Sequence, residues 1–566
     1  MKNSIKTQFA IAIMALLFGG QVSAQINWAY ANNYGATLND AARGNAVETN
    51  GDYYVTGYFT DSIKFGGIKL YSAGGSDIFI AKFNTGGGAV WAVRAGSVNN
   101  DEGASVTIAS GDTLFVAGFY SGSTTGNFAV GLVGAGRDVF VHKMRKSNGA
   151  PIATATAGSN GNDEGKSIVY NKKVNAIYLT GYHATGCTFS GATFGGLGSA
   201  GSTDIFAAGI STNMTWLWAN RDGGVGADEG HSICVNDSGE LFTTGFFSSN
   251  IVVDGMALPR LYVGGRDMYV FKYVPTTGVV SYIYNAGSTA NDEGNGISSS
   301  PAKGVYVTGY HSNNCNFGGG ALPANSLDIF VLSLSNILAY TDGVSNTGVG
   351  ANPDAGQSIT YDRWCNTIYV AGYAGNTCNF GGGARALVGQ AGFVARYTTA
   401  LAIVWDRTTD GAGNEQTLAV ASNGSSNITS AGFMCSAPAA FTSATAPIIN
   451  LNSLGGSDVW CGEVAAGAGC AGGGSAAPEQ YNSMQTSIAL ISEIKIYPNP
   501  TVDLLNIVTD EPINSVVLTD LQGRAVMTIN PHTPQHTLSI THLPAGIYLL
   551  LVMTDNHTDL TKVMKQ

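Results

Sequence analysis

Adjacent acidic side chains recur along this chain, and they are the residues best suited to metal binding or acid–base chemistry. Six aspartates occupy equivalent places in a repeated N-D-E-G-like loop: Asp40, Asp101, Asp163, Asp228, Asp292 and Asp354. Four of them are followed by a glutamate, which gives the candidate pairs Asp101–Glu102, Asp163–Glu164, Asp228–Glu229 and Asp292–Glu293. Clustered carboxylates could hold Ca²⁺, which prefers several oxygen ligands, or focus a negative field on cationic groups. These eight residues are our candidate ligand or calcium residues, and no other cofactor is indicated.

The repetition of these loops favours a structural role over a binding role. An aspartate can accept backbone hydrogen bonds within its turn, and the glycine beside it can adopt special dihedral angles. A structural need recurs in every unit, whereas a binding site need not. A second set of aspartates opens a D-I-F motif, and we expect it to tie a strand to a neighbouring loop: Asp77, Asp138, Asp204, Asp267, Asp328 and Asp458.

Catalysis is the alternative use of the acidic loops. Asp228 and Glu229 could act as paired carboxylates in a polymer-degrading hydrolase or lyase. Neighbouring side chains on an extended segment point to opposite faces, however, and the acidic loops are nearly uniform among the units. His183, His231 and His311 fit ordinary loop positions better than a catalytic set. The sequence contains no H-E-x-x-H, G-x-S-x-G or phosphate-binding loop, so we predict a protein that is not an enzyme.

The eight cysteines make disulfides plausible if the protein is exported. Cys315 and Cys378 follow the repeat glycine at the same distance in neighbouring units, so they could bridge adjacent loops. Cys461 and Cys470 could staple the last strand of the repeat region. Cys234, within an apolar run, is expected to be a buried thiol. No paired Cys or His spacing indicates zinc, and we predict no metal site with confidence.

The elements that position these residues follow from a repeat. The glycine of a Y-V-T-G-Y block recurs every 60 to 64 residues, at Gly57, Gly118, Gly181, Gly245, Gly309, Gly372 and Gly432. Each unit contains four strand-like runs, which we call A, B, C and D. The A–B and C–D joints are short and suit hairpins, whereas the B–C and D–A joints are longer and glycine-rich. The long loops should therefore crowd one face of the assembly.

Seven four-stranded units at a fixed period predict an all-β fold, a seven-bladed β-propeller. The region begins with a lone D-type strand, Ile26 to Tyr30, and its last unit ends on a C-type strand, Asp458 to Val464. We predict that these two strands pair, which would close the ring and hide exposed strand edges.

The repeat resembles the bacterial family named for seven-bladed β-propellers (SBBP). The matching motifs are Y-V-T-G-Y-F at Tyr54 to Phe59, F-G-G at Phe65 to Gly67 and S-D-I-F-I-A-K-F at Ser76 to Phe83. Two units depart from the pattern: we read Gly392 as replacing the aspartate of D-I-F, and Asn414 as replacing the aspartate of N-D-E-G. The resemblance implies a fold and no defined activity.

The N-terminus predicts export from the cytoplasm, and the composition disfavours nucleic-acid binding. The chain has 566 residues and a net charge of −11, which disfavours nucleic-acid binding. Residues 1–24 read as a signal peptide for export to the periplasm, with Lys2 and Lys6 before an apolar stretch and a small-residue cleavage site before Gln25. We expect no integral membrane span, because no other stretch is long and apolar enough.

The tail has its own composition. We expect the propeller over 25–465, a Gly/Ala/Ser-rich linker over 466–488 and a small β-sandwich over 489–566. This last part resembles the C-terminal sorting domain of the type IX secretion system of Bacteroidetes, through Y-P-N-P (Tyr497, Pro498, Asn499 and Pro500), L-Q-G-R around Gly523, L-P-A-G-I-Y around Gly546 and a terminal K-V-M-K. The resemblance implies export by the type IX machinery, removal of the tail, and release or attachment to surface lipopolysaccharide.

These observations predict a secreted or outer-membrane cell-surface binding module for a glycan, peptide or matrix partner. A hydrolase or lyase and a structural or adhesive surface component are the alternatives. An exposed aromatic platform would favour glycan binding, and Tyr120, Phe247 and Tyr262 are its candidates.

Overall fold

The computed structural model describes residues 28–465 and 495–565, apart from 185, 193–195, 199–200, 255, 259–264, 302, 323, 325–326, 347–352, 381–384, 412, 425–426, 436–438, 442–448, 452, 454–455, 498–500, 502, 510–511, 520–524, 545 and 555–557. The predicted signal peptide, the linker, Cys470 and Tyr262 lie outside the described residues. The chain divides into two compact units, residues 1–475 and 476–566. The described residues form strands, and no helix among them is long and apolar enough to cross a membrane.

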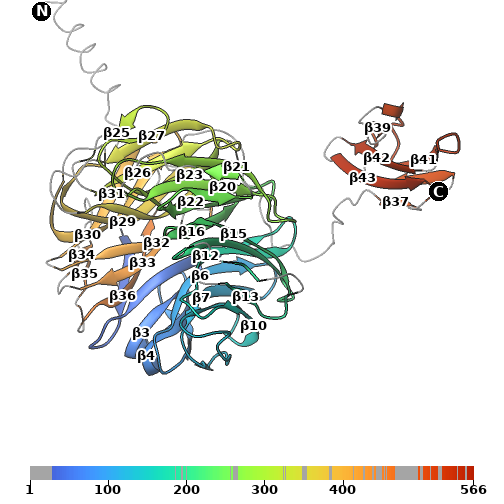
Figure 1. Cartoon of the computed structure of the whole chain (residues 1–566). Coiled ribbons are helices and arrows are strands. Elements are labelled where there is room, and N and C mark those ends of the chain that lie inside the picture. The colour runs from blue at the N-terminus through green and yellow to red at the C-terminus, as the bar shows by residue number, and fades with distance from the viewer. Residues whose placement is uncertain are drawn as a thin grey trace, which may run out of the picture. The chain divides into compact units, whose positions relative to one another are not determined.

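The described residues of the first compact unit form seven large antiparallel sheets, each built on four main strands in the order A, B, C, D, and one two-stranded sheet (Figure 1). The first three repeats hold β2 (Ala41–Val47), β3 (Tyr53–Phe65), β4 (Ile68–Phe83) and β5 (Ala89–Gly96); β6 (Glu102–Ala109), β7 (Thr113–Tyr120), β9 (Asp138–Met144) and β10 (Pro151–Gly158); β11 (Glu164–Asn171), β12 (Ala176–His183), β14 (Asp204–Ser211) and β15 (Trp216–Gly224).

The remaining repeats follow the same order. They hold β16 (Asp228–Val235), β17 (Leu241–Phe247), β20 (Asp267–Tyr273) and β21 (Val280–Ala286); β22 (Glu293–Ser300), β23 (Gly304–Ser312), β26 (Leu327–Leu334) and β27 (Tyr340–Asn346); β28 (Ala355–Asp362), β29 (Thr367–Cys378), β30 (Arg385–Thr398) and β31 (Ile403–Asp410); and β32 (Gln416–Ser422), β33 (Asn427–Met434), β36 (Asp458–Ala465) and β1 (Trp28–Tyr34).

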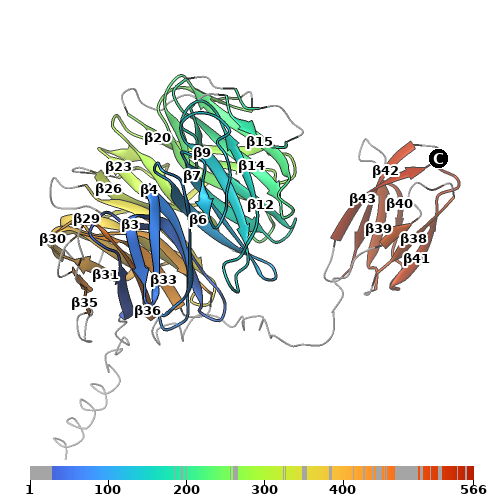
Figure 2. The ribbon, with the colours of Figure 1, turned by 90° about the horizontal axis from the view of Figure 1, so that it is seen from below.

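The seventh sheet joins the two ends of the repeat region, as the sequence predicts. β1 runs antiparallel to β36, with Ala31 opposite Gly462 and Tyr34 opposite Val459. Figures 1 and 2 show blue β3 and β4 of the first repeat beside orange β33 and β36 of the seventh. One apolar cluster contains side chains of both repeats, including Tyr53, Phe79 and Val459.

The A strands contact one another in sequence. β2 contacts β6, β6 contacts β11, and the contacts continue through β16, β22, β28 and β32, which returns to β2. Several of these contacts repeat one hydrogen bond, in which a serine hydroxyl accepts from a backbone N–H of the next A strand. Ser105 accepts from Ile168 at 3.3 Å, and Ser167 accepts from Ile233 at 3.3 Å. The serine of the D-E-G-x-S motif therefore joins neighbouring sheets.

The B–C loops take part in the sheets. Several add short strands to the D strand of the preceding sheet: β8 (Thr125–Gly126) on β5, β13 (Thr188–Phe189) on β10, β18 (Ile251–Val253) with β19 (Met256–Leu258) on β15, and β34 (Ala439–Phe441) with β35 (Ile449–Leu451) on β31. In the fifth repeat β24 (Cys315–Asn316) pairs with β25 (Ala321–Leu322). These additions cover outer strand edges that would otherwise be open to other chains.

The F-G-G motif of these loops supplies an aromatic side chain to the core. Phe65 lies 5.1 Å from Phe79, and Phe317 lies 4.7 Å from Phe330, measured between ring centroids. In the second repeat Phe128, which is followed by Ala129 and not by glycine, makes the same kind of contact with Phe140 at 5.0 Å. The second ring of each pair belongs to the D-I-F motif of the same repeat. Both motifs therefore form one buried aromatic contact that holds the B–C loop to its sheet.

The second compact unit contains two antiparallel sheets. One has the order β37 (Lys495–Tyr497), β38 (Leu504–Val508), β41 (Gln535–Ser539), and the other has the order β40 (Ala525–Ile529), β39 (Ser515–Thr519), β42 (Gly546–Met553), β43 (Thr558–Lys565). Leu505 and Leu538 of the first sheet share a core with Leu518 and Val552 of the second. Of the tail motif residues, Tyr497 ends β37 and Gly546 begins β42, whereas Pro498, Asn499, Pro500 and Gly523 lie outside the described residues.

Candidate functional site

The repeated aspartates are buried within their loops. In the second repeat Asp101 accepts the backbone N–H groups of Ser97, four residues before it, and of Ser121, twenty residues after it, at the end of the B strand. Asp228 repeats this with Gly224 at 2.8 Å and Ser248 at 2.9 Å. Each carboxylate therefore joins the D–A loop to the end of the B strand.

The other aspartates follow the same plan. Donors four residues before or about twenty residues after the carboxylate are Ala36 and Thr60 for Asp40, Ser159 and Ala184 for Asp163, Ser288 and Ser312 for Asp292, and Gly375 for Asp354. Burial raises the pKa of these carboxyls, to about 6 for Asp163 and Asp228 and to about 7 for Asp40, Asp292 and Asp354. The hydrogen bonds that these carboxylates accept lower the pKa and so partly offset the effect of burial.

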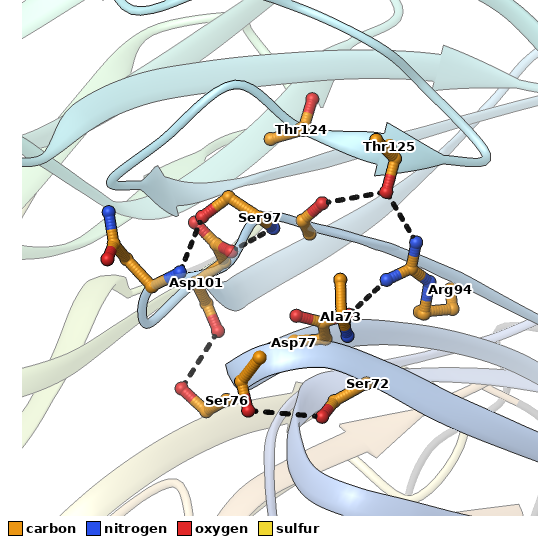
Figure 3. A network of polar contacts seen from close by, with 12 residues as sticks. Ser72, Ala73, Ser76, Asp77, Arg94, Ser97, Asp101, Thr124 and Thr125 are labelled. Carbon is orange, nitrogen blue, oxygen red and sulfur yellow. Dashed lines mark hydrogen bonds and ion pairs between the residues drawn. The ribbon is translucent and has the colours of Figure 1, made fainter.

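The D-I-F aspartates hold the start of the C strand. Asp77 accepts the N–H of Ala73 at 2.8 Å and forms an ion pair with Arg94, whose other amino group donates to Thr125 at 2.6 Å (Figure 3). Thr125 lies on β8, so this network ties the first sheet to the loop of the second repeat. Asp138 likewise accepts the N–H of Val133 at 2.6 Å.

The glutamates beside the aspartates form ion pairs near the A strands. Glu164 contacts Arg137 and Lys166, and Glu293 contacts Arg266. Arg137 and Arg266 both come directly before a D-I-F aspartate of the preceding repeat. Where that position is serine or threonine, the glutamate has another partner: Glu102 contacts Arg43 at 3.0 Å, and Glu229 contacts His231 at 3.7 Å.

Two sequence readings were shifted by one residue. The strand register places Ala391, opposite Ala374, at the position of Asp77, which lies opposite Phe59, so Ala391 and not Gly392 replaces the D-I-F aspartate. In the seventh repeat the N–H of Glu415 donates to Gln390, as that of Asp101 donates to Ser76. Glu415 is fully buried, so this loop retains an acid where we had read only Asn414.

An axial cavity of about 310 Å³ lies where the A strands meet. Its lining includes the residue that follows D-E-G in every repeat: Arg43, Ala104, Lys166, His231, Asn295, Gln357 and Leu418. Glu102 and Glu229 also line it. The three residues before this position are D-E-G in four of the seven repeats, and serine or glycine follows it in six, while the position itself differs in all seven. We did not single it out from the sequence, although this contrast was visible there.

The side chains of the axial cavity contact one another. His231 lies beside Glu229 and shares a hydrogen bond of 3.1 Å between its Nδ1 and Oδ1 of Asn295. Asn295 in turn donates to the carbonyl of Gly356 at 2.9 Å. The cavity thus combines a charged arc from the first four repeats with neutral side chains from the last three.

Two further cavities adjoin this one over the first three repeats. One, of about 290 Å³, shares Arg43 and Glu102 with the axial cavity and also contacts Tyr58 and Phe119. The other, of about 660 Å³, shares Asn100 and Arg137 with its neighbour. The three cavities are therefore linked by common lining residues.

Other sequence candidates are placed elsewhere. His183 and His311 are fully buried, and burial lowers the pKa of His311 to about 4. Tyr120 and Phe247 are fully buried as well, so neither belongs to an exposed aromatic platform. Among the described residues no group of three or more His, Cys, Asp or Glu side chains is arranged to hold a metal ion.

The predicted disulfides are wrong. Cys315, Cys378 and Cys461 are buried thiols outside any disulfide, so neither the pairing of Cys315 with Cys378 nor that of Cys461 with Cys470 is formed. These thiols lie among apolar side chains, and burial raises the pKa of Cys461. Cys234 is a buried thiol, as expected. Cys365, which the sequence did not single out, is disulfide-bonded.

Comparison with known proteins identifies one domain of this chain. No curated protein matches the chain. A solved structure of PorZ, described as an essential bacterial surface component of the type-IX secretion system of Porphyromonas gingivalis, matches over 95% of this chain and 100% of that one. The two share 10% sequence identity, and the TM-score is 0.18. Residues 495–566 match the secretion system C-terminal sorting domain. The chain therefore carries a type IX sorting domain and is exported to the cell surface or secreted.

Proposed function

We propose that residues 28–465 form a seven-bladed β-propeller. Seven four-stranded sheets support this architecture, as do the contacts that run from β2 through each A strand and back to β2. The pairing of β1 with β36 supplies the seventh sheet with its D strand. In this arrangement the axial cavity occupies the mouth of the central channel.

We propose further that this propeller is a binding module at the cell surface or in the medium. The observation that carries the proposal is the variation at the axial position, where arginine, lysine, histidine, asparagine, glutamine, alanine and leucine occupy the place that follows D-E-G or its counterpart. The fold constrains the residue type equally at equivalent positions of every repeat. A position whose residue differs in all seven repeats is therefore free of that structural constraint, and here it lines a cavity. Heterogeneous polar groups around a concavity are typical of a ligand site.

The catalytic alternative rests on the pair Asp228 and Glu229. Both oxygens of Asp228 accept backbone N–H groups, and the adjacent Glu229 lies on the cavity wall beside His231. The Asp228 carboxylate therefore holds the backbone of its loop, whereas the Glu229 carboxylate lies at the cavity, so the two do not act as a pair. We propose that the module binds without chemical turnover, and that it does so without Ca²⁺, because the aspartates are engaged by the backbone.

The purified full chain should be screened on glycan arrays, peptide libraries and extracellular matrix proteins, with 2 mM Ca²⁺ or with EDTA (on the order of the weaker extracellular calcium affinities). Product release from polysaccharides should be followed in parallel. We expect binding that EDTA does not change, no released product, and loss of binding in the variant H231A/Q357A. The exposed V388A change, away from the cavity, is the control.

Released product would refute the non-catalytic proposal, and loss of binding in EDTA would return the acidic loops to the site. Absence of binding to every probe would refute the binding module and leave a structural or adhesive surface role.

A further inference from the structure

We propose that the three linked cavities form a trough for a neutral oligosaccharide. The trough is defined by Arg43, Glu102, Asn100, Arg137 and Asn162, and it crosses the first three repeats from the axis outward. This inference rests on the proposed binding function and names its ligand class. Three observations support it. The cavities share lining residues, their asparagine and arginine side chains are held in place by hydrogen bonds and ion pairs, and their positive and negative charges are paired.

The connection gives the trough a length that suits a chain of sugars. Arg43 and Glu102 line both the axial cavity and its neighbour, and Asn100 and Arg137 line both that neighbour and the outer cavity. The three volumes, about 310, 290 and 660 Å³, together suit an extended ligand better than one small molecule.

Exposed asparagines in the trough are held with their amino groups available. The Oδ1 of Asn100 accepts the N–H of Ser76 at 3.0 Å, and the Oδ1 of Asn162 accepts the N–H of Arg137 at 3.3 Å. Both residues are exposed. Each amide is thus fixed by its oxygen and retains two N–H donors, which are suited to sugar hydroxyls.

The arginines are also fixed in place. Arg137 lies over the ring of Phe119 at 4.4 Å and contacts Glu164, and Arg43 lies over Tyr58 at 5.4 Å and contacts Glu102. About two fifths of the Arg137 side chain remains exposed, at 38%. A stacked, paired guanidinium loses little freedom on binding and still has N–H groups to donate.

The charges around the trough compensate one another, which indicates a neutral ligand. Arg43 is paired with Glu102, and Arg137 and Lys166 share Glu164, while Glu229 adds a third carboxylate on the wall. An anionic polymer would meet these carboxylates, and a cationic one would meet the arginines. A peptide would need an apolar pocket for an anchor residue, but Phe119 is 6% exposed beneath Arg137.

The test compares matched positions inside and outside the trough. Arg266 in the fourth repeat has the same surroundings as Arg137, since it pairs with Glu293 and lies 4.0 Å from the Phe246 ring, yet it lines none of the three cavities. Asn291 in the fifth repeat accepts an N–H from Arg266 as Asn100 does from Ser76. Binding of the full chain to cellohexaose, xylohexaose, mannohexaose, laminarihexaose and hexagalacturonate should be measured by calorimetry for R137Q, R266Q, N100A and N291A.

We expect at least one neutral hexaose to bind, with affinity reduced at least tenfold in R137Q and N100A and unchanged in R266Q and N291A. Equal effects inside and outside the trough, or none in either, would overturn the trough. Binding of hexagalacturonate or of a peptide that depends on Arg137 would overturn the neutral-sugar assignment and leave the binding module intact. If no hexaose binds, the assignment fails, and the broader screen decides separately whether the binding module fails with it.

Discussion

Between the sixth and seventh repeats, two departures from the repeat compensate each other. In the fifth repeat the B strand carries Thr308, and a Cβ on Gly356 of the next A strand would lie 2.1 Å from its Oγ1. The sixth B strand carries Ala371 instead, and the next A strand carries the buried Thr417. The threonine has moved across the contact between sheets, so the volume of the contact is retained.

This exchange predicts that A371T, which restores the usual B-strand residue, destabilises the protein by about 1–3 kcal/mol through overpacking. The double variant A371T/T417G recreates the pair seen at Thr308 and Gly356 and should recover most of that loss. Calorimetric melting of the single and double variants measures the coupling. Additive effects of the two changes would show that the residues do not share one volume.

Asp222 predicts a pH dependence of stability. Its carboxylate is buried and accepts the hydroxyl of Tyr273 at 2.7 Å, and burial raises its pKa from 3.8 to about 7, with Asp254 adding to the increase. The folded state therefore binds a proton more tightly than the unfolded state. The resulting stability is complete below pH 4 and is lost as pH rises through 7. The melting temperature should fall from pH 5 to pH 8, and less so in D222N.

The D222N comparison isolates this group, because the amide can still accept the Tyr273 hydroxyl. An unchanged pH profile in D222N would assign the effect to other acids, such as the repeated loop aspartates. Asp222 could not be predicted from the sequence, because its burial between two repeats depends on the register of distant strands. The loop aspartates could be found from their spacing, and their repetition favoured a structural role. The backbone hydrogen bonds that they accept fit that role, because a residue that the fold requires recurs in every repeat.

At the scale of elements, the B–C loop is the part that sequence reasoning described least well. F-G-G was recognised as a motif, but nothing local indicates that its phenylalanine packs on the D-I-F ring, or that β8 extends the sheet of the preceding repeat. The four strands of each repeat were predictable because alternation and turn residues are local signals. Pairing across repeats depends on long-range geometry and was predictable only at β1, where a missing strand required a partner.

The loop contact predicts that F128A releases β8 from its neighbour. Phe128 is 5% exposed and packs on Phe140 and His142, so truncation to alanine should cost about 3–5 kcal/mol locally and expose the loop. Limited proteolysis followed by mass spectrometry should show cleavage within residues 121–137. L132A, at an exposed position of the same loop, is the control and should remain resistant. Equal cleavage of both variants would mean that Phe128 does not hold the loop.

For the whole molecule, the contact between β1 and β36 joins the stability of the first and seventh repeats. Trp28 lies 5.6 Å from Trp460 and 5.1 Å from Phe441, so three aromatic rings from distant parts of the chain form one contact. If the sheets form the proposed propeller, loss of this contact destabilises all of them, because every sheet in a closed ring packs against two neighbours.

W28A should therefore lower the melting temperature of the entire first compact unit in one transition. W364A removes a tryptophan that is 47% exposed and serves as the matched control, with little expected change. Differential scanning calorimetry of both variants measures the effect. A separate early transition in W28A, with the remaining sheets melting as in the wild type, would indicate a linear stack of independent repeats.

The β1–β36 pair also sets an order in time. β1 precedes every other described strand during synthesis, and its partner comes almost last in the repeat region, shortly before the sorting domain. The first strand must therefore wait without its partner until nearly all of the repeats exist. The strand that completes the seventh sheet and the sorting domain that directs export are therefore both translated in the last part of the chain.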